Sequence, residues 1–349
     1  MSSTEVTIPY TKLGDSGLSI SRIIVGCMSY GSKKWSPWVL DDEDEIMEIL
    51  KKCYDLGIRT FDTADMYSNG QSEIWLGKFL KKYNIKRDRV VILTKLFNVI
   101  DEDDPSFNTF TASGPDYVNS RGLSRKHIFD AVEASVKRLG TYIDVLQIHR
   151  LDLNTPKHEI MKGLNDVVLD GKVRYLGASS MKAVDFVQLQ AIADKNGWAK
   201  FISMQNYYNL LYREQENEMN YFCNNNVFGN VGLIPWSPIA AGVLAKPASV
   251  TAETTHPRTS PIIQMLHLDK LDENDVEIVN RVEELAKKHG VSMAIIATAW
   301  VLSKGAHPIV GLNSIKRVEE AVQATQFKFT DEEIKYLEEP YKHKYYKYF

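Results

Sequence analysis

Four residues of this chain carry side chains that can move a proton, and each follows a segment typical of a β-strand. They are Asp62, Tyr67, Lys95 and His149. The strand-like segments before them are 57–61, 89–94 and 143–148. In a barrel of parallel strands the carboxyl ends of the strands meet on one rim, which is the catalytic face. The four side chains are therefore expected to lie together on that rim.

The four side chains suit one kind of chemistry best. A tyrosine is a weak acid with an ordinary pKa of about 10, and an ammonium at Lys95 is expected to lower that pKa by favouring the phenolate. Asp62 would keep Lys95 charged and oriented, and His149 would bond a substrate oxygen or share the proton. This set favours delivery of a proton to a carbonyl oxygen while hydride reaches the carbon. Nucleophilic catalysis is less favoured, because no Ser or Cys is paired with a base in these motifs.

Each residue also has an ordinary structural interpretation. A lysine at a strand end is most often solvated, and a histidine after an apolar strand is most often a hydrogen-bonded structural group. The Asp-Thr-Ala segment at 62–64 could cap a helix. Catalysis is favoured because the four occur jointly at the ends of three successive strands.

The elements that must position these residues alternate along the chain. A hairpin is expected over 10–20, around the turn at 14–17. Strand-like runs begin near residues 23, 58, 90, 143, 173, 201, 232 and 308, and helix-like runs lie at 42–55, 71–82, 124–139, 157–169, 183–195, 213–223, 274–288 with 293–303, and 314–324. This alternation predicts an α/β fold, a closed (β/α)8 TIM barrel. The alternative, an open doubly wound sheet, would usually carry GxGxxG after its first strand, and this sequence has no such motif there.

Three segments are expected to shape a pocket at the rim. The connections over 96–122 and 240–270 are too long for ordinary turns, and such loops are usually lids or binding loops. The aromatic tail from 341 to 349 could fold over the pocket or be a frayed end. No internal repeat or linker divides the chain, so one domain is expected over 1–349.

Composition narrows the class of protein. The net charge is only −3 and charges of both signs are interleaved, so no basic face indicates nucleic acid. Three cysteines, far apart, form no metal-binding spacing, so no metal site and a reducing compartment are expected. The N-terminus lacks the pattern of a signal peptide, and the longest uncharged stretch, 231–245, is too short to span a bilayer. A cytoplasmic protein without membrane contact is expected, and its oligomeric state is left open.

Further rim segments have the composition of ligand-binding loops. Gly177-Ala178-Ser179-Ser180 offers close approach and hydroxyls after one strand, and Gln205-Asn206 offers amides after the next. Trp236 could stack on a flat ring or simply pack in the core. Gly311-Leu312-Asn313-Ser314 opens a helix with Arg317 in its first turn, a good place for a phosphate, although a plain N-cap with a solvated Arg317 is the alternative.

These motifs together resemble the aldo-keto reductases over nearly the whole chain. The matching segments are 13–18, Phe61-Asp62-Thr63-Ala64-Asp65-Met66-Tyr67, Leu93-Thr94-Lys95, 144–150, Gly177-Ala178-Ser179-Ser180, 205–210, 236–244 and Val310-Gly311. The segments 119–128 and 207–213 look most similar to the fungal aryl-alcohol dehydrogenase-like branch. Potassium-channel β subunits of the same superfamily have Asn in the position of His149, so the histidine here favours a working enzyme.

The resemblance implies a barrel that binds NADPH across the rim without a Rossmann motif. It implies Tyr67 as general acid, Lys95 and Asp62 as its tuning pair, and His149 as the residue that orients the substrate. It also implies a set of cofactor-binding residues: Cys27, Met28, Ser179, Ser180, Gln205, Trp236, Ser237, Pro238, Ile239, Ala240, Gly242, Arg258, Gly311, Asn313, Ser314, Arg317 and Glu320. Arg317 would favour the 2′-phosphate of NADP.

The expected function is therefore NADPH-dependent reduction of aldehydes, and of ketones as a second class, reversible as oxidation of aryl alcohols. Two other hypotheses stay open. The same barrel could be an NADP(H)-binding redox sensor with little turnover, read by a protein partner. It could also be a barrel of another class, such as a sugar-phosphate isomerase or a glycosidase, although a glycosidase needs two carboxylates and only Asp62 is placed at the rim.

Overall fold

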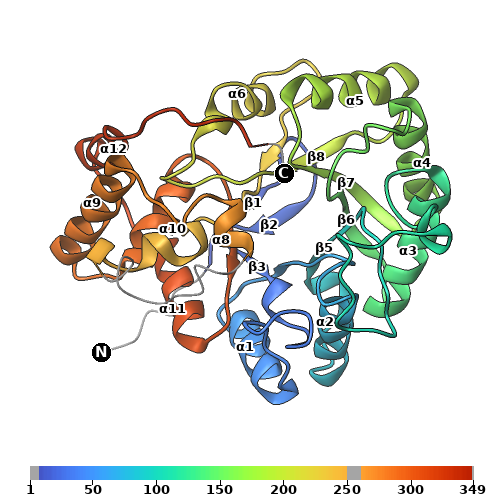
Figure 1. Ribbon diagram of the computed structural model, residues 1–349, viewed down its shortest axis with the longest axis horizontal. Helices are drawn as coiled ribbons and strands as arrows, with labels where there is room; N and C mark the ends of the chain where they lie inside the picture. The colour runs from blue at the N-terminus through green and yellow to red at the C-terminus, as the bar shows by residue number, and fades with distance from the viewer. Residues whose placement is uncertain (1–7, 250–260, 348–349) are drawn as a thin grey trace.

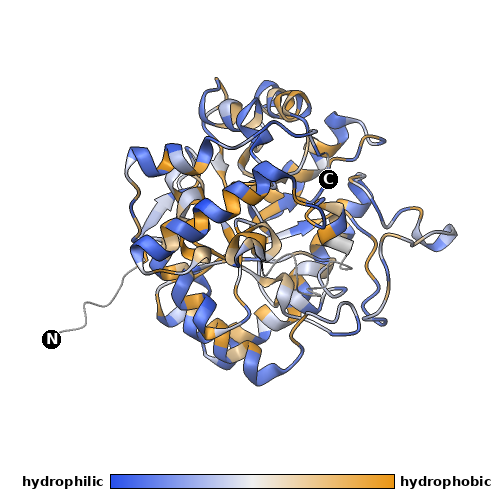
Figure 2. Cartoon of the chain, turned by 60° about the vertical axis from the view of Figure 1, so that its left-hand side comes forward, coloured by the Kyte–Doolittle hydropathy of each residue, from blue (hydrophilic) through white to orange (hydrophobic). Residues whose placement is uncertain are grey.

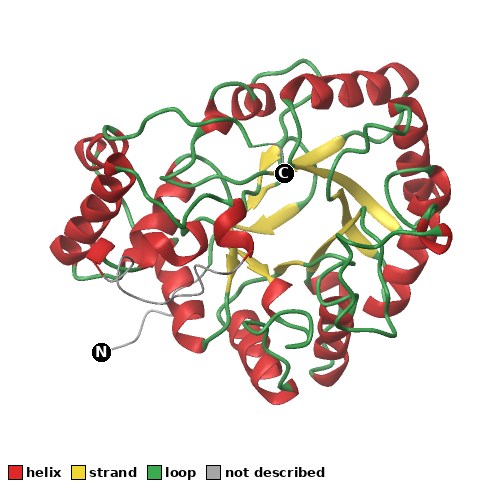
Figure 3. Ribbon diagram, in the orientation of Figure 1, coloured by secondary structure: helices red, strands yellow, loops and turns green. Residues whose placement is uncertain are grey.

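Eight parallel strands form a single curled sheet at the centre of the molecule (Figures 1 and 3). The computed structural model describes residues 8–249 and 261–347. The strands lie in the order β10-β3-β4-β5-β6-β7-β8-β9. Their bounds are β3 Ile24–Gly26, β4 Thr60–Asp62, β5 Val91–Leu96, β6 Ile143–Ile148, β7 Val173–Ser179, β8 Phe201–Gln205, β9 Gly232–Leu233 and β10 Ile309–Gly311.

Backbone hydrogen bonds join the two ends of this sheet. The amide of His307 donates to the carbonyl of Leu233 at 2.8 Å, and that of Ile309 donates to Pro235 at 2.9 Å. Trp236 and Ile309 pair as a parallel bridge. Strand β9 therefore meets β10, and the predicted closed (β/α)8 barrel is confirmed.

Helices surround the sheet (Figure 3). Their bounds are α1 Glu43–Asp55, α2 Gln71–Lys82, α3 Arg125–Leu139, α4 Lys157–Leu169, α5 Ala183–Asn196, α6 Met219–Asn224, α8 Pro261–Met265, α9 Glu273–His289, α10 Met293–Ser303, α11 Ile315–Ala324 and α12 Asp331–Glu338. Helix α3 shows why they form. The Ser124 side chain caps its first turn and Gly140 ends it in the left-handed conformation. Its apolar stripe, which includes Ile128 and Val132, is buried, and in Figure 2 the helices are hydrophilic on one side and hydrophobic on the other.

Three helices differ from the sequence-based expectation. The run predicted over 213–223 is divided into a short 3₁₀ helix, Glu214–Glu216, and α6, because the side chains of Glu214 and Gln215 turn to bond the tail and Asn206. Helix α8 lies within the long connection predicted over 240–270. Helix α12 was not predicted, although Thr330 and Glu333 form a complete capping box at its start.

The predicted hairpin consists of β1 Tyr10–Lys12 and β2 Ser19–Ser21. It lies against the end of the barrel where the strands begin, and its turn bonds Asn230 just before β9. Leu13 and Ile20 are fully buried in a cluster with Leu93, Val145 and other inward-facing strand residues. A side chain at Gly232 would collide with Leu13, because an added Cβ would lie 2.5 Å from Leu13 Cδ1. This apolar layer fills the barrel interior next to the polar side chains at the other ends of the strands, where the predicted site lies.

The C-terminal tail runs from α12 back toward the strands (Figure 1). The Tyr341 hydroxyl donates to Glu214 Oε1 at 2.6 Å, and the backbone amide of Lys344 donates to the same oxygen at 2.7 Å. The Tyr346 hydroxyl donates to Gln215 Oε1 at 2.7 Å. The tail as far as residue 347 is thus fastened to the segment that follows β8.

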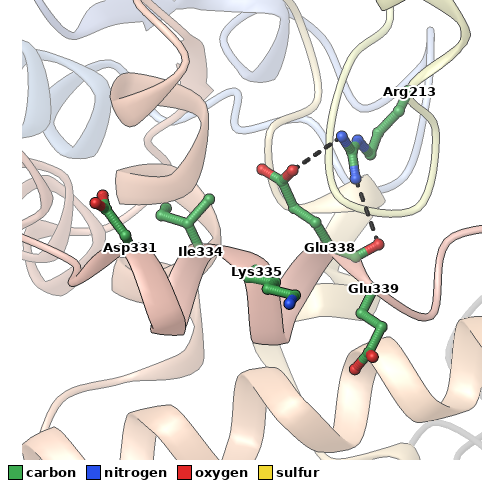
Figure 4. A pocket seen from close by; sticks show the side chains of 6 residues that line it. All are labelled: Arg213, Asp331, Ile334, Lys335, Glu338 and Glu339. Carbon is green, nitrogen blue, oxygen red and sulfur yellow. Dashed lines mark hydrogen bonds and ion pairs between the residues drawn. The ribbon is translucent and has the colours of Figure 1, made fainter.

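A hollow beside α12 lies apart from the predicted site. It is lined by Arg213, Asp331, Ile334, Lys335, Glu338 and Glu339, and Figure 4 shows the Arg213 guanidinium bonded to Glu338 across it. Because that arginine is already paired with two carboxylates, of Glu216 and Glu338, the hollow holds a structural contact. Over the described residues, no helix combines the length and the apolar character that a membrane span would need.

Candidate active site

The structure brings three of the four predicted catalytic residues into direct contact. Lys95 Nζ lies 2.5 Å from Asp62 Oδ2 and 3.2 Å from the Tyr67 hydroxyl, and it also donates to the carbonyl of Thr63 at 2.8 Å. The Lys95 side chain has no exposed surface. All three donors of the ammonium are therefore used, which fixes its position against the phenol.

Neighbouring strands explain why these residues meet. Asp62 ends β4, Lys95 lies in β5, and the two strands pair in parallel register with Asp62 opposite Leu93. The chain then turns over the end of β5, where the amides of Thr63 and Asp65 donate to the carbonyls of Leu93 and Lys95 at 2.8 and 3.0 Å. This turn carries Tyr67 to a point above Lys95.

Two glutamines hold the Asp62 carboxylate from the other side. Gln147 Nε2 and Gln205 Nε2 each donate to Asp62 Oδ1 at 2.9 Å, and Gln205 Nε2 also lies 2.8 Å from Gln147 Oε1. The sequence reasoning missed Gln147. Its spacing contained part of the signal, because Gln147 lies in β6 and His149, two residues further, directly follows that strand, so the two face the same side.

His149 completes the group through its ring. Its centroid lies 5.9 Å from that of Tyr67, with the rings nearly perpendicular at 85°. His149 Nδ1 is buried and has no hydrogen-bond partner among the described residues. Burial, with the charges of Arg150 and Lys95, holds the pKa of His149 well below its usual value of 6.5. The imidazole is therefore neutral at physiological pH and can bond an oxygen without carrying a charge.

The electrostatics of Tyr67 correct one expectation. Burial raises the pKa of the phenol above 10, and Lys95 opposes that rise without overcoming it. Burial also works against the charge of Lys95, but Asp62 and Tyr67 outweigh it and leave the pKa of Lys95 raised. The phenol is thus not made a stronger acid than usual in this structure. It remains protonated over the physiological range, next to a permanent ammonium that would stabilise the phenolate once the proton has left.

The segment after β7 is joined to the segment after β8. Ser179 Oγ donates to the carbonyl of Gln205 at 2.7 Å, and the amide of Ser180 donates to Asn206 Oδ1 at 2.9 Å. Ser180 has a φ of 45°, which is uncommon for a residue other than glycine. The predicted amide-binding residues Ser179, Ser180 and Gln205 therefore lie together, with the side-chain nitrogen of Gln205 already bonded to Asp62 and Gln147.

The predicted ring-stacking residue lies in an aromatic stack. The ring centroid of Trp236 is 4.8 Å from that of Tyr207, and Tyr207 in turn stacks on Tyr212 at 5.0 Å. Tyr207 and Tyr212 are buried, whereas Trp236 is half-buried. One part of the indole thus faces away from the stack.

The segment after β9 is a tight turn that leads into a 3₁₀ helix, Ala240–Ala245. Four of its residues have positive φ angles: 58° at Ser237, 48° at Ala240, 51° at Ala241 and 97° at Gly242. An added Cβ at Gly242 would have no atom within 4 Å. The amides of Ala240, Ala241 and Gly242 donate within the segment, to Ser237 O, Ser237 Oγ and Ile239 O at 2.9–3.0 Å, and so hold its shape. Pro238 and Ile239 lie within the same segment, so the predicted residues 237–242 form one open loop.

The segment after β10 offers a positive helix end. Ser314 Oγ caps α11 by accepting from the amide of Arg317 at 3.4 Å, and Arg317 Nη1 donates to Asn313 Oδ1 at 2.5 Å. Arg317 is exposed and Glu320 lies one turn further along α11. An added Cβ at Gly311 would meet only Ser29 Oγ, at 3.8 Å, so the backbone here is open to a ligand. These features fit the phosphate end of a dinucleotide.

Strand β3 brings two more predicted residues to the rim. Gly26 pairs with Gly311 of β10, so Cys27 and Met28 follow at the same level. Met28 packs against Ala64, Met66 and Tyr67, while Cys27 is buried and burial raises the pKa of its thiol. Arg258 lies outside the described residues. Within residues 8–249 and 261–347, no group of three or more His, Cys, Asp or Glu is arranged to hold a metal ion.

Comparison with known proteins identifies the family. The sequence profile of the Aldo/keto reductase family matches residues 22–342. The chain belongs to the aldo-keto reductase family, as its motifs indicated, and is therefore an oxidoreductase related to enzymes that act on carbonyls and alcohols.

Its relatives lie in the fungal aryl-alcohol dehydrogenase-like branch. It is 56% identical to "Putative aryl-alcohol dehydrogenase AAD16" of Saccharomyces cerevisiae, over 97% of this chain and 98% of that protein. It is 55% identical to versiconal hemiacetal acetate reductase of Aspergillus parasiticus, over 95% and 96% of the two chains. It is 52% identical to "Putative aryl-alcohol dehydrogenase C977.14c" of Schizosaccharomyces pombe, over 95% of each chain.

Proposed function

We propose that this protein reduces aldehydes, and ketones as a second class, to alcohols with NADPH, and that it oxidises aryl alcohols in the reverse direction. The observation that carries the proposal is the contact of Lys95 Nζ with both Asp62 and Tyr67. A buried ammonium held at hydrogen-bond distance from a protonated phenol is an arrangement for releasing a proton and stabilising the anion that remains.

The cofactor is proposed to lie across the rim from β7 to β10. Ser179, Ser180 and Gln205 would hold its amide, Trp236 its ring, the loop 237–242 its pyrophosphate, and Asn313, Ser314 and Arg317 its adenosine end. The open space beside the backbone at Gly242 and Gly311 supports this fit. When bound, NADPH supplies hydride from its nicotinamide C4. The exposed guanidinium of Arg317 favours the 2′-phosphate that distinguishes NADP from NAD.

The chain's own residues then deliver the proton to the substrate. The substrate carbonyl oxygen is proposed to bind between the Tyr67 hydroxyl and the neutral imidazole of His149, whose rings face each other edge-on. The proton passes from Tyr67 Oη to that oxygen as the carbon is reduced. Lys95 stabilises the resulting phenolate, and Asp62, held by Gln147 and Gln205, keeps Lys95 in place. The burial of all four groups keeps competing water away from the transfer.

The proposed enzyme is one catalytic domain acting on small carbonyl compounds in the cytoplasm. All three cysteines are free thiols and buried, in keeping with a reducing compartment.

The test is consumption of NADPH with a broad panel of benzaldehydes, aliphatic aldehydes and ketones. Turnover is expected, and Tyr67→Phe should reduce kcat about 10²–10⁴-fold, the usual contribution of a general acid, while NADPH still binds. Tyr221→Phe is the matched control, because Tyr221 is 68% exposed and should leave kcat unchanged.

Full activity in Tyr67→Phe would refute the assigned role. Tight NADPH binding without turnover of any carbonyl would support the alternative, an NADP(H)-dependent sensor. Failure to bind NADPH would contradict both.

A further inference from the structure

Arg150 is an arginine at the rim, and none of the carboxylates in residues 8–249 and 261–347 is its counter-ion. It follows His149 directly, is half-buried, and donates to the carbonyl of His149. No carboxylate of the described residues lies within ion-pair distance of it, whereas Arg87, Arg138 and Arg213, which are also mostly buried, are paired with Asp144, Glu73 and Glu338. A desolvated charge without a partner is costly, so the site is electrostatically incomplete as it stands.

Arg150 acts on the reacting groups through its charge. That charge lowers the pKa of Tyr67 and of His149, although burial decides the net direction at each of them. Burial in turn lowers the pKa of Arg150, and Tyr67 opposes this effect. The geometry agrees with this, since the guanidinium bonds the backbone carbonyl of His149, whose ring lies 5.9 Å from that of Tyr67.

The proposed cofactor phosphates are not its natural partner. In the order of the barrel, β9 and β10 are three and four strands away from β6, which Arg150 follows by two residues. The loops 237–242 and 311–317 therefore lie across the barrel from it. Since neither these phosphates nor a carboxylate of the described residues is placed to pair with Arg150, a substrate is the natural source of the anion.

The wall near Tyr67 indicates the kind of molecule that would bring this anion. The ring of Trp35 lies 6.5 Å from that of Tyr67, and the ring of Trp38 lies 5.9 Å from Trp35. Met28, Trp35 and Ile100 pack on the small cluster that contains Tyr67. A flat apolar body can rest on such a wall while its charged group reaches the guanidinium.

We infer that Arg150 is a specificity-determining residue that binds the carboxylate of an aromatic aldehyde during reduction. This inference rests on the proposed reductase function and names a class of substrate for the same site. A guanidinium can hold a carboxylate by two parallel hydrogen bonds, so the position of the carboxylate on the ring should matter.

The test compares the three isomers of carboxybenzaldehyde with their methyl esters, as substrates of the full-length protein with NADPH. One isomer is expected to have a kcat/KM about tenfold or more above that of its ester, the effect of one charge-assisted hydrogen bond. Arg150→Gln should lower activity on both compounds, because Tyr67 loses a nearby charge, but should abolish the preference for the acid. Arg150→Lys should retain part of it, and Arg174→Gln, an exposed arginine on β7, should retain all of it.

Two outcomes separate the inference from the function on which it rests. If neutral aldehydes are reduced but no isomer is preferred to its ester, or if Arg150→Gln keeps the preference, Arg150 has no such role and the reductase stands. If no aldehyde is reduced, the proposed function fails, and benzoate still tests the site. Calorimetry should then show that benzoate binds the wild-type protein and binds Arg150→Gln at least tenfold more weakly. Equal binding would overturn the inference.

Discussion

Gln205 donates to the Asp62 carboxylate at 2.9 Å. Gln205 was expected only to contact the cofactor. It also helps to hold the carboxylate that binds Lys95. Because Gln147 shares the same carboxylate oxygen, the three side chains form a layer inside the barrel that joins β4, β6 and β8. The catalytic lysine is positioned by strands on both sides of the barrel, not by Asp62 alone.

Gln205→Leu should therefore destabilise the fold as well as weaken cofactor binding. It leaves a buried carboxylate with one donor fewer, which should lower the free energy of unfolding by about 1–3 kcal/mol. Urea unfolding followed by circular dichroism measures this. Gln188→Leu, on the exposed side of α5, is the control. A variant as stable as the wild type but with weaker NADPH binding would restrict Gln205 to the cofactor.

The pH dependence of the reaction should differ between its two directions. Burial raises the pKa of Tyr67, so the phenol should stay protonated up to at least its ordinary pKa of about 10. Reduction should then show no loss caused by Tyr67 between neutral pH and that value, while alcohol oxidation, which needs the phenolate as base, should rise with pH. Profiles of kcat/KM in both directions measure this.

His149 should contribute no ionisation to these profiles near pH 6.5, because its imidazole is already neutral. An ionisation near pH 6.5 that vanishes in His149→Gln would contradict the neutral state assigned to His149.

Gly177 is packed too tightly to accept any side chain. An added Cβ would lie 2.4 Å from Ser203 Oγ and 2.8 Å from Gln147 Cγ. Gly177→Ala should displace Gln147 from Asp62, lower kcat and cost about 1–3 kcal/mol of stability. Adding Ser203→Ala should restore part of both. Gly17→Ala is the control, because its nearest atom would be 3.9 Å away. An unchanged Gly177→Ala enzyme would show that Gln147 is dispensable.

Glu333 should stabilise the C-terminal helix in a pH-dependent way. Burial alone would raise its pKa, but Lys288, His289 and the capping box with Thr330 hold it at about 2, below the usual 4.5. Its contribution is therefore complete above about pH 4.5 and is lost as the pH falls toward 2. Glu333→Gln should lose roughly 1 kcal/mol at neutral pH, and the difference from the wild type should shrink through that range.

Thermal or urea unfolding at several pH values measures the contribution of Glu333. Glu332→Gln removes the same charge from the same turn, at an exposed position. Equal losses in the two variants would mean that only the helix dipole is involved.

Much of the fold could be predicted because local patterns determine it. Ser124 and Gly140 mark the ends of α3 where the capping rules place them, and the residues that follow β4, β5 and β6 meet because parallel strands share one rim. Helix α12 was not predicted although Thr330 and Glu333 form its capping box, because eight residues carry too little apolar periodicity to indicate a helix.

The parts that could not be predicted depend on contacts across the barrel. The spacing of Gln147 and His149 could place Gln147 on the right face of its strand, but it could not identify its partner Asp62, which is 85 residues away. The direction of the Tyr67 pKa depended on how deeply the phenol is buried, which spacing alone cannot give. The unpaired state of Arg150 is likewise visible only after every carboxylate of the described residues has been placed.

The fastening of the tail has a practical consequence. A relay of hydrogen bonds runs from Tyr346 through Gln215 and Asn206 to the backbone of Ser180. Shortening the chain at its C-terminal end, or fusing an affinity tag there, would thus disturb a segment that lies close to the proposed nicotinamide site. Purification handles for kinetic work belong at the opposite terminus.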